Sequence, residues 1–435
     1  MARGARINWT RYAIVAAAIA LIVGAIWTLR PVFIPDAPPP TVEETAARIH
    51  GSVIAIDTHV DIPSTFATDI YDPGKPGAYP VQVDLPRMRE GGLDAVFFIV
   101  YAGQGARDDA GYAGAASEAF AKFAAIRRMT DNLYPDEIGL ARSSADIRRL
   151  HAEGKRVALI GIENGYVAGR TPELLDIYYD LGARYLGLVH NGHNDIADSA
   201  LPQEKFTDRT NEEGGEHGGL SDFGRALIAR ANDLGLMIDV SHASKAAALE
   251  AIERSRAPVI ASHSSVHALH PHPRNMTDEE IKALAAKGGV IQIVAFDAYL
   301  HEVPEEKVTA RRDLAASLGL TSLDAFFGAS EETKRKFAEG VAALDAKWPR
   351  ATVATLADHI DHAVKLAGID HVGISSDFQG GGGIEGWSHA GETLNVTAEL
   401  VRRGYTEEQI AKLWGENLMR VMDAAEAARR GGGNR

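Results

Sequence analysis

Residues that could bind a metal ion follow an apolar segment near the start of the chain. The run Ile54–Ile56 leads into His59 and Asp61. Alternate residues of a β-strand point to the same side, so these two side chains would face one point just beyond the strand. Imidazole nitrogens and carboxylate oxygens are typical ligands of zinc and similar divalent ions. The spacing predicts a pair of metal ligands, although a strand followed by a polar turn would give the same pattern.

Similar polar residues follow later apolar segments. Together with the first pair they make four histidines and three carboxylates, namely His59, Asp61, Glu163, His190, His242, His263 and Asp377. Burying so many ionisable groups is costly unless they pair with one another or bind metal. The set therefore predicts a metal-dependent active site.

Two metal ions fit this set better than one. His59 and Asp61 would hold the first ion, and His242 and His263 the second. Glu163 lies between the two pairs in strand order and could bridge the ions with its two oxygens. A water bridging the same ions would have a pKa lowered toward neutrality, which provides a hydroxide nucleophile without a serine or cysteine.

Two residues of the set remain for the substrate. His190 is suited to polarise a carbonyl group or to stabilise an oxyanion. Asp377 could either transfer protons or bind a substrate amine.

The elements that must position these residues are eight short apolar segments separated mostly by helical patterns. Continuous apolar strands indicate a parallel sheet buried on both faces, and eight such units predict a (β/α)₈ TIM-type barrel, whose strand ends converge on one mouth. The predicted strands are Val53–Asp57, Asp94–Val100, Val157–Ile162, Tyr185–Val189, Leu236–Val240, Pro258–Ala261, Gly289–Val294 and His371–Ser375.

An open, doubly wound sheet is the alternative fold. It has little support, because no glycine-rich dinucleotide motif follows the first strand and the run Gly380–Gly383 lacks a P-loop lysine. Residues 301–350 are charged and helical in pattern. They predict an insertion after the seventh strand, either a lid or a contact between the copies of a homodimer.

The N-terminal region predicts a membrane anchor. Tyr12–Leu29 is uncharged and about long enough to cross a bilayer as a helix. Arg3, Arg6 and Arg11 precede it, which would leave the N-terminus in the cytoplasm of a bacterial-type cell and the catalytic body in the periplasm or outside. A cleaved signal peptide is the alternative.

This reading divides the 435 residues into four parts. Residues 1–30 are the single-pass anchor, 31–41 a proline-rich linker, 42–428 the barrel and 429–435 a disordered tail. The net charge of -14 argues against nucleic acid as a partner. The absence of cysteine excludes a thiol nucleophile and disulfides.

The chain resembles the membrane dipeptidases, also called renal dipeptidases (peptidase family M19), from about His50 to Ala424. The matching segments are Asp57–Asp61, Gly161–Gly165, Leu188–Asn191, Gly219–Gly224, Ile238–His242, Ala261–Ser265, Pro273–Met276 and Gly373–Phe378. The resemblance implies a (β/α)₈ fold, a binuclear zinc site and hydrolysis of free dipeptides, including those with a D-residue at the C-terminal position.

The same resemblance implies roles for single residues. His59 and Asp61 would bind one zinc, His242 and His263 the other, and Glu163 and a hydroxide would bridge them. His190 would contact the substrate. Arg274 would bind its carboxylate, and Asp377 would lie near its amine.

The chain departs from the family at several places. Asn164 and Tyr166 stand where the family often has Gly and His. The family often has Asp-Phe-Asp-Gly where this chain has Asp377-Phe378-Gln379-Gly380, which removes a charge near the mouth, and the insertion is longer than expected. A hydrolase of the same barrel type acting on another small amide or lactam is the alternative function. A barrel that only binds a ligand is a third reading, but it would lack metal ligands, and none is missing.

Overall fold

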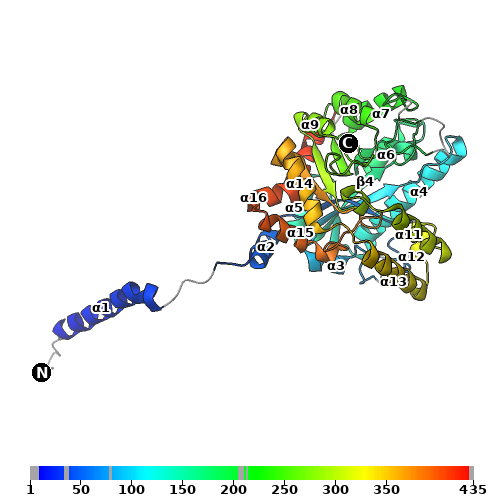
Figure 1. Cartoon of the computed structure of the whole chain (residues 1–435). Coiled ribbons are helices and arrows are strands. Elements are labelled where there is room, and N and C mark those ends of the chain that lie inside the picture. Colours follow the sequence, from blue (N-terminus) through cyan, green and yellow to red (C-terminus); the bar gives the residue numbers. More distant parts are fainter. Residues whose placement is uncertain (1–8, 34–38, 78–80, 204–209, 212–213, 431–435) are drawn as a thin grey trace. The chain divides into compact units, whose positions relative to one another are not determined.

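The computed structural model describes residues 9–33, 39–77, 81–203, 210–211 and 214–430. The chain divides into two compact units, Met1–Glu44 and Thr45–Arg435. Helix α1 (Trp9–Phe33) belongs to the first unit (Figure 1). Helix α2 (Val42–His50) begins at the end of the first unit and leads into the second.

The predicted membrane anchor is not supported by the structure. A helix does form over Tyr12–Leu29, as part of α1. Among the described residues, however, no helix combines the length and the apolar character that crossing a membrane requires. Helix α1 also continues to Phe33, so the predicted linker does not begin at residue 31, and residues 34–38 of that linker lie outside the described residues.

The second unit is a parallel, nearly closed barrel. Its described residues form a nine-stranded sheet in which eight strands follow one another in the order β1-β2-β4-β5-β6-β7-β8-β9, while β3 pairs only with β4. The parallel bridge between Val60 and Phe378 joins the two ends of that order. The strands are β1 (Ile56–Asp61), β2 (Ala95–Tyr101), β3 (Ile138–Leu140), β4 (Arg156–Glu163), β5 (Ala183–Gly187), β6 (Met237–Asp239), β7 (Ile260–Ser264), β8 (Val290–Val294) and β9 (Val372–Ser375).

The predicted TIM-type barrel is therefore confirmed, with different strand limits at two positions that matter for the site. Strand β1 runs to Asp61, because its pairing with β2 continues to Asp61 opposite Ile99. Strand β7 includes His263 and continues to Ser264, which pairs with Ile293 of β8. These ligand candidates are thus held within strands rather than in the turns that follow them.

Helices surround the strands and fill the connections between them (Figure 1). The α-helices up to the eighth barrel strand are α3 (Leu85–Gly91), α4 (Asp109–Arg127), α5 (Ser144–Ala152), α6 (Leu174–Leu181), α7 (Asp222–Leu234), α8 (Lys245–Arg254), α9 (Asp278–Ala286), α10 (Asp297–Leu300), α11 (Glu305–Ser317), α12 (Leu323–Phe327), α13 (Glu331–Lys347) and α14 (Val353–Ala367). After it come α15 (Leu394–Arg402), α16 (Glu407–Ala411) and α17 (Asn417–Ala427). Short 3₁₀ or π-helical turns are η1 (Arg128–Leu133), η2 (Gly165–Ala168), η3 (Ile369–His371), η4 (Ala390–Glu392) and η5 (Lys412–Glu416).

Capping side chains fix the start of several helices. Ser221 caps α7 by accepting the Gly224 N–H, and Thr277 and Glu280 form a reciprocal capping box at the start of α9. Such caps satisfy backbone N–H groups that have no partner within the helix.

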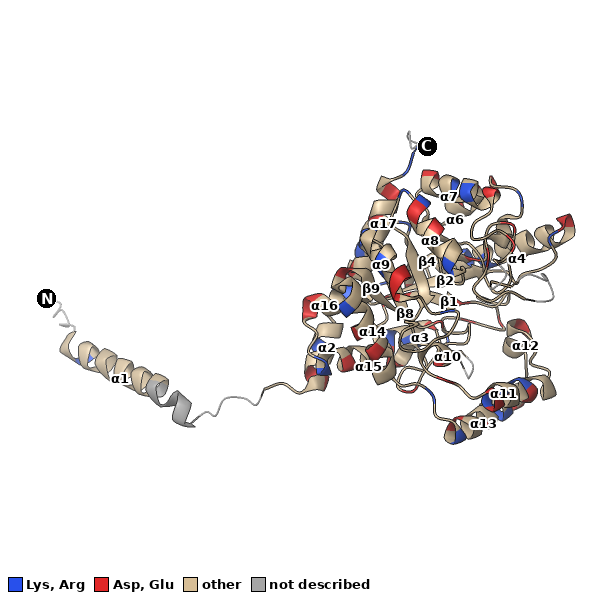
Figure 2. Ribbon diagram, turned by 45° about the horizontal axis from the view of Figure 1, so that its top comes forward, with Lys and Arg blue, Asp and Glu red and all other residues tan. Residues whose placement is uncertain are grey.

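The predicted insertion consists of α11, α12 and α13 between β8 and β9, where β8 is the seventh strand around the barrel. Figure 2 shows charged residues along α11 and α13, which lie side by side at one edge of the barrel unit. The predicted tail begins later than residue 429, because the Arg430 N–H donates to the Asp233 carbonyl. The residues after it lie outside the described part of the chain.

Candidate metal centre

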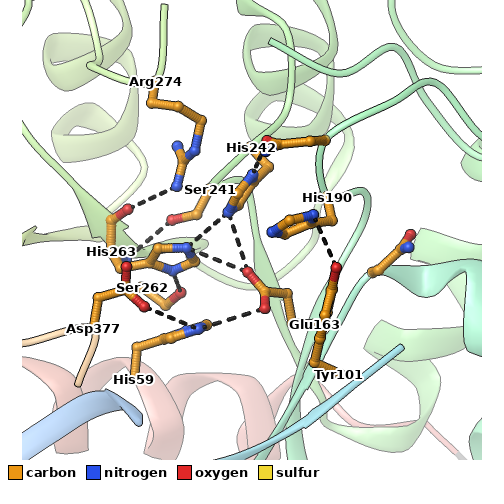
Figure 3. A network of polar contacts seen from close by, with 12 residues as sticks. His59, Tyr101, Glu163, His190, Ser241, His242, Ser262, His263, Arg274 and Asp377 are labelled. Carbon is orange, nitrogen blue, oxygen red and sulfur yellow. Dashed lines mark hydrogen bonds and ion pairs between the residues drawn. The ribbon is translucent and has the colours of Figure 1, made fainter. Parts of the chain in front are cut away.

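Seven of the eight predicted site residues gather at the carboxyl ends of the barrel strands, and six of them are drawn in Figure 3. Their positions follow from the parallel topology, because all strands of such a barrel end at the same mouth. The residues are His59 and Asp61 in β1, Glu163 at the end of β4, His190 after β5, His242 after β6, His263 in β7 and Asp377 after β9.

The Glu163 carboxylate stands at the centre of this group. Its Oε1 lies 3.1 Å from His242 Nε2 and 3.3 Å from His263 Nε2. Its Oε2 lies 3.6 Å from His59 Nε2, which is also 3.6 Å from Asp61 Oδ2 and 4.0 Å from Asp377 Oδ1. The two oxygens therefore face two different sets of side chains, as a bridging carboxylate requires.

Hydrogen bonds on the far side of each ring determine which nitrogen of each histidine faces Glu163. The Tyr185 hydroxyl donates to the Thr58 carbonyl at 3.1 Å and lies 3.2 Å from His59 Nδ1, so it accepts from that nitrogen. The His242 Nδ1–H donates to Asn191 Oδ1, which is 3.0 Å away. In both rings the proton is therefore on Nδ1 and the lone pair on Nε2.

His263 reaches the same tautomer through a short relay. The Ser262 hydroxyl donates to Asp239 Oδ2 at 2.6 Å, so its oxygen accepts from His263 Nδ1, 2.8 Å away. Asp239 is itself fixed as an acceptor, because its Oδ1 receives the N–H groups of Ser241 at 3.0 Å and of Ser262 at 2.9 Å.

These residues fit divalent metal ions. The three Nε2 lone pairs converge on Glu163, and His242 Nε2 and His263 Nε2 are only 2.9 Å apart, with no proton available to join them. His59 Nε2 and Glu163 Oε1 are buried and receive no hydrogen bond from any described residue. A cation between such atoms replaces the missing partners, and nitrogen and carboxylate donors are those that zinc prefers.

The electrostatics of His242 and His263 agree with this assignment, because both rings are held neutral. Burial lowers the pKa of His242 well below its ordinary value, and the charge of Arg274 adds to the effect. Burial lowers the pKa of His263 in the same way. Burial also favours neutral His59, but the charges of Glu163 and Asp61 outweigh it and hold the pKa of that ring well above its ordinary value. The surplus of negative charge thus attracts a cation to the His59 side.

His190 and Asp377 complete the mouth. The His190 ring lies 4.2 Å from the His242 ring, and its Nδ1 is 3.4 Å from the Tyr101 hydroxyl. Asp377 has a positive φ of 56° and His242 one of 67°, a left-handed conformation that is uncommon outside glycine and concentrates at functional sites.

Arg274, the eighth predicted residue, is buried beside the metal ligands rather than in a surface ion pair. Its Nη2 donates to the His263 carbonyl at 3.0 Å, and its guanidinium lies over the Tyr299 ring, 5.2 Å from the centroid. A cavity of about 180 Å³ adjoins Arg274, His242 and Ser264. A buried guanidinium next to a cavity is suited to bind a carboxylate.

The residues that orient the rings were missed by sequence reasoning. Ser262 and Asn191 each stand next to a recognised histidine, so adjacency was an available signal. Tyr185 and Asp239 gave none, because they lie inside apolar strands and reach the rings only through the barrel fold. Gln379, which removes a charge relative to the family pattern, donates its side-chain N–H to the Asp61 carbonyl and contacts the Tyr71 hydroxyl, which the sequence did not indicate.

Comparison with known proteins assigns the chain to a family. The sequence model of the membrane dipeptidase family (peptidase family M19) matches residues 43–434. Dipeptidase aclJ of Aspergillus oryzae is 31% identical over 350 residues, which cover 79% of this chain and 70% of that protein. Dipeptidase tcpJ of Claviceps purpurea is 30% identical over 349 residues, covering 79% and 69%.

Solved structures of similar proteins share the fold of this chain. The probable dipeptidase PvdM from Pseudomonas aeruginosa matches with a TM-score of 0.77 and 33% identity, over 90% of this chain and 100% of that one. A metallo peptidase from Rhodobacter sphaeroides, liganded with a phosphinate mimic of L-Ala-D-Ala, shares the fold with a TM-score of 0.63 and 23% identity, over 86% and 99%. The chain therefore belongs to the membrane dipeptidase family, peptidase family M19.

Proposed function

We propose that this protein hydrolyses the peptide bond of free dipeptides with two divalent metal ions, for which zinc is the expected metal. The observation that carries the proposal is the position of Glu163. One of its oxygens faces the Nε2 atoms of His242 and His263, and the other faces His59. A single ion would not need two separate sets of ligands on either side of one carboxylate.

The residues divide between the two ions as their distances suggest. His59 and Asp61 would hold one ion, His242 and His263 the other, and Glu163 would contact both. Ions bound there would lower the pKa of a water molecule and polarise the substrate carbonyl.

His190 would stabilise the negative charge that develops on the carbonyl oxygen. Its ring lies beside His242 and contacts Tyr101, which holds it at the edge of the metal site. A hydrogen-bond donor fixed at this place acts on the transition state more than on the bound substrate.

Two charged groups would recognise the ends of the dipeptide. Arg274 would bind the terminal carboxylate. Burial raises the pKa of Asp377 well above its ordinary value, and Asp61 and Glu163 add to that effect although His59 opposes it. A substrate ammonium arriving there would favour the charged carboxylate, so Asp377 would bind the amine or take up a proton from it.

Because the site would recognise the terminal carboxylate of the substrate rather than the side chain of its second residue, it would accept either the L or the D configuration there. The Rhodobacter sphaeroides relative was liganded with a mimic of L-Ala-D-Ala. We therefore include dipeptides with a C-terminal D-residue among the proposed substrates.

The test is steady-state hydrolysis by zinc-loaded protein of L-Ala-L-Ala, L-Ala-D-Ala and their N-acetylated and C-amidated forms. The free dipeptides should be cleaved, and each blocked form should be cleaved at least about a hundredfold more slowly, since a buried charge is left unpaired. Glu163→Gln serves as the control for contaminating peptidases. Equal rates on free and blocked dipeptides, or cleavage of a lactam but of no dipeptide, would overturn the proposal.

A further inference from the structure

The side-chain amide of Gln379 has hydrogen-bond partners at both its nitrogen and its oxygen. Its Nε2 donates to the Asp61 carbonyl at 2.6 Å. Its Oε1 accepts the Val83 N–H at 3.4 Å and lies 2.7 Å from the Tyr71 hydroxyl, which also contacts the Val83 carbonyl. The side chain is buried, with 8% of its surface exposed. A carboxylate of the same length can accept from Tyr71 but cannot donate to the carbonyl, so an acidic residue would leave that carbonyl facing a negative charge.

The contact with Asp61 fixes the end of strand β1. The Asp61 N–H donates to the Phe378 carbonyl at 3.0 Å, while its own carbonyl accepts from Gln379. Both backbone groups of Asp61 are thus held by two consecutive residues of the segment after β9. The Asp61 carboxylate, which stands 3.6 Å from His59 Nε2, takes its position from this backbone.

The other end of the Gln379 side chain leads to the helical insertion. The Tyr71 ring stacks on Phe327 of α12, with centroids 4.8 Å apart and planes 5° from parallel. Phe327 is 3% exposed, so the stack is part of the packed interior. A second contact lies nearby, where Asp324 Oδ1 accepts the Ser64 N–H at 3.0 Å. Helix α12 therefore packs on the segment that follows β1.

The insertion is fixed within itself as well. Phe326 of α12 meets Phe337 of α13 edge-on, with centroids 4.9 Å apart, and Phe337 is buried. Adjacent phenylalanines of α12 thus differ in one ring contact: Phe327 stacks on Tyr71, whereas Phe326 meets Phe337 of α13. This difference provides a matched pair of substitutions.

We propose that Gln379 is a positioning residue for the metal site, and that the insertion supports the His59–Asp61 side of that site through the contacts Phe327–Tyr71–Gln379–Asp61. The proposal rests on the metal-dependent function proposed above. It connects two of the departures from the family pattern, because the insertion supplies the ring that holds Tyr71 and the amide links Tyr71 to Asp61.

The test measures zinc binding by the full-length, metal-free protein in competition with a chromophoric chelator, which gives two stepwise dissociation constants. Asp61→Ala identifies the constant that belongs to the His59–Asp61 ion. Gln379→Met, which keeps the length but neither donates nor accepts, should weaken that constant about ten- to a hundredfold and leave the other within about threefold. Tyr71→Phe, which keeps the ring, should weaken the same constant and serves if Gln379→Met does not fold.

The insertion is tested by Phe327→Leu against Phe326→Leu. Phe327→Leu should weaken binding of the zinc ion that depends on Asp61, whereas Phe326→Leu should not. In the Gln379→Met background, Phe327→Leu should cause no further loss of zinc affinity. Unchanged constants in Gln379→Met and Tyr71→Phe would overturn the role of Gln379. Equal effects of the two phenylalanine variants, or full additivity with Gln379→Met, would overturn the role of the insertion.

Failure of this proposal is distinguishable from failure of the proposed function, because zinc binding is measured without substrate. A wild-type chain that binds two zinc ions but cleaves no dipeptide would refute the function alone. A wild-type chain that cleaves dipeptides while Gln379→Met binds zinc normally would refute the positioning role alone.

Discussion

Replacing Asp239 by asparagine should change the tautomer of His263 by altering one atom that does not touch the ring. The new side chain can keep its oxygen on the N–H groups of Ser241 and Ser262. Its amide nitrogen then replaces Oδ2 and donates to the Ser262 hydroxyl, which must turn its own proton toward His263 Nδ1. The ring would carry its proton on Nε2, the nitrogen that faces Glu163.

The loss of zinc affinity in this variant follows from the hydrogen bond that would be broken when zinc binds. To bind zinc through Nε2, the His263 ring must carry its proton on Nδ1. There that proton meets the proton of the Ser262 hydroxyl, so one buried donor is left without an acceptor. Such a loss costs about 1–3 kcal/mol, which corresponds to roughly five- to 150-fold in affinity. We expect the constant of the His242–His263 ion to weaken by roughly ten- to a hundredfold in Asp239→Asn.

Two measurements check this reasoning. Nitrogen-15 NMR of histidine-labelled, metal-free protein reports which ring nitrogen carries the proton, and chelator competition reports the zinc affinity. Asp57→Asn is the matched control: Asp57 is a buried aspartate of β1 whose Oδ1 accepts the backbone N–H groups of His59 and Ser376, and no hydroxyl links it to a histidine ring nitrogen among the described hydrogen bonds. If Asp239→Asn left the His263 tautomer and the zinc affinity unchanged, the assignment of the lone pairs would be refuted.

Three further outcomes are expected. Arg274→Ala should raise KM or lower kcat/KM for dipeptides by an amount worth about 2–5 kcal/mol, with zinc content unchanged; loss of zinc in this variant would contradict a role limited to the substrate. A chain beginning at Thr41 should keep both its zinc and its activity, because every site residue belongs to the unit Thr45–Arg435; a folded but inactive product would contradict this. Burial lowers the pKa of His359 to about 4 from 6.5, so its contribution to stability is complete above about pH 6.5 and is lost as the pH falls toward 4. His359→Gln should remove about 3 kcal/mol of that pH dependence in urea unfolding of metal-free protein, and identical pH dependence in both chains would refute it.

The barrel could be predicted from the sequence because its strands are uninterrupted apolar runs, a pattern that arises when both faces of a parallel sheet are buried. Strand β3 was missed because Ile138–Leu140 is short and contains a glycine, so it gives no such run. The limits of β1 and β7 were wrong for a different reason: polar residues inside them were interpreted as strand ends, whereas pairing with β2 and β8 keeps them extended.

The candidate ligands could be predicted because a barrel brings every strand end to one mouth, whatever the distance along the chain. The orientation of these ligands could not be predicted. The partners that set the tautomers, Tyr185 and the Ser262–Asp239 pair, act through hydrogen bonds between strands that depend on register. The contacts of Gln379 could not be predicted, because a missing charge is visible in a sequence, whereas a donor placed against the Asp61 carbonyl is visible only in the fold.

The claim that two metal ions share Glu163 is tested most directly by the amount of zinc bound. Metal-free protein should be saturated with zinc, freed of excess ions by gel filtration and analysed for metal per chain, with Glu163→Ala treated in parallel. The account predicts two zinc ions per wild-type chain and fewer in the variant. No more than one ion in the wild-type chain at saturation would contradict it.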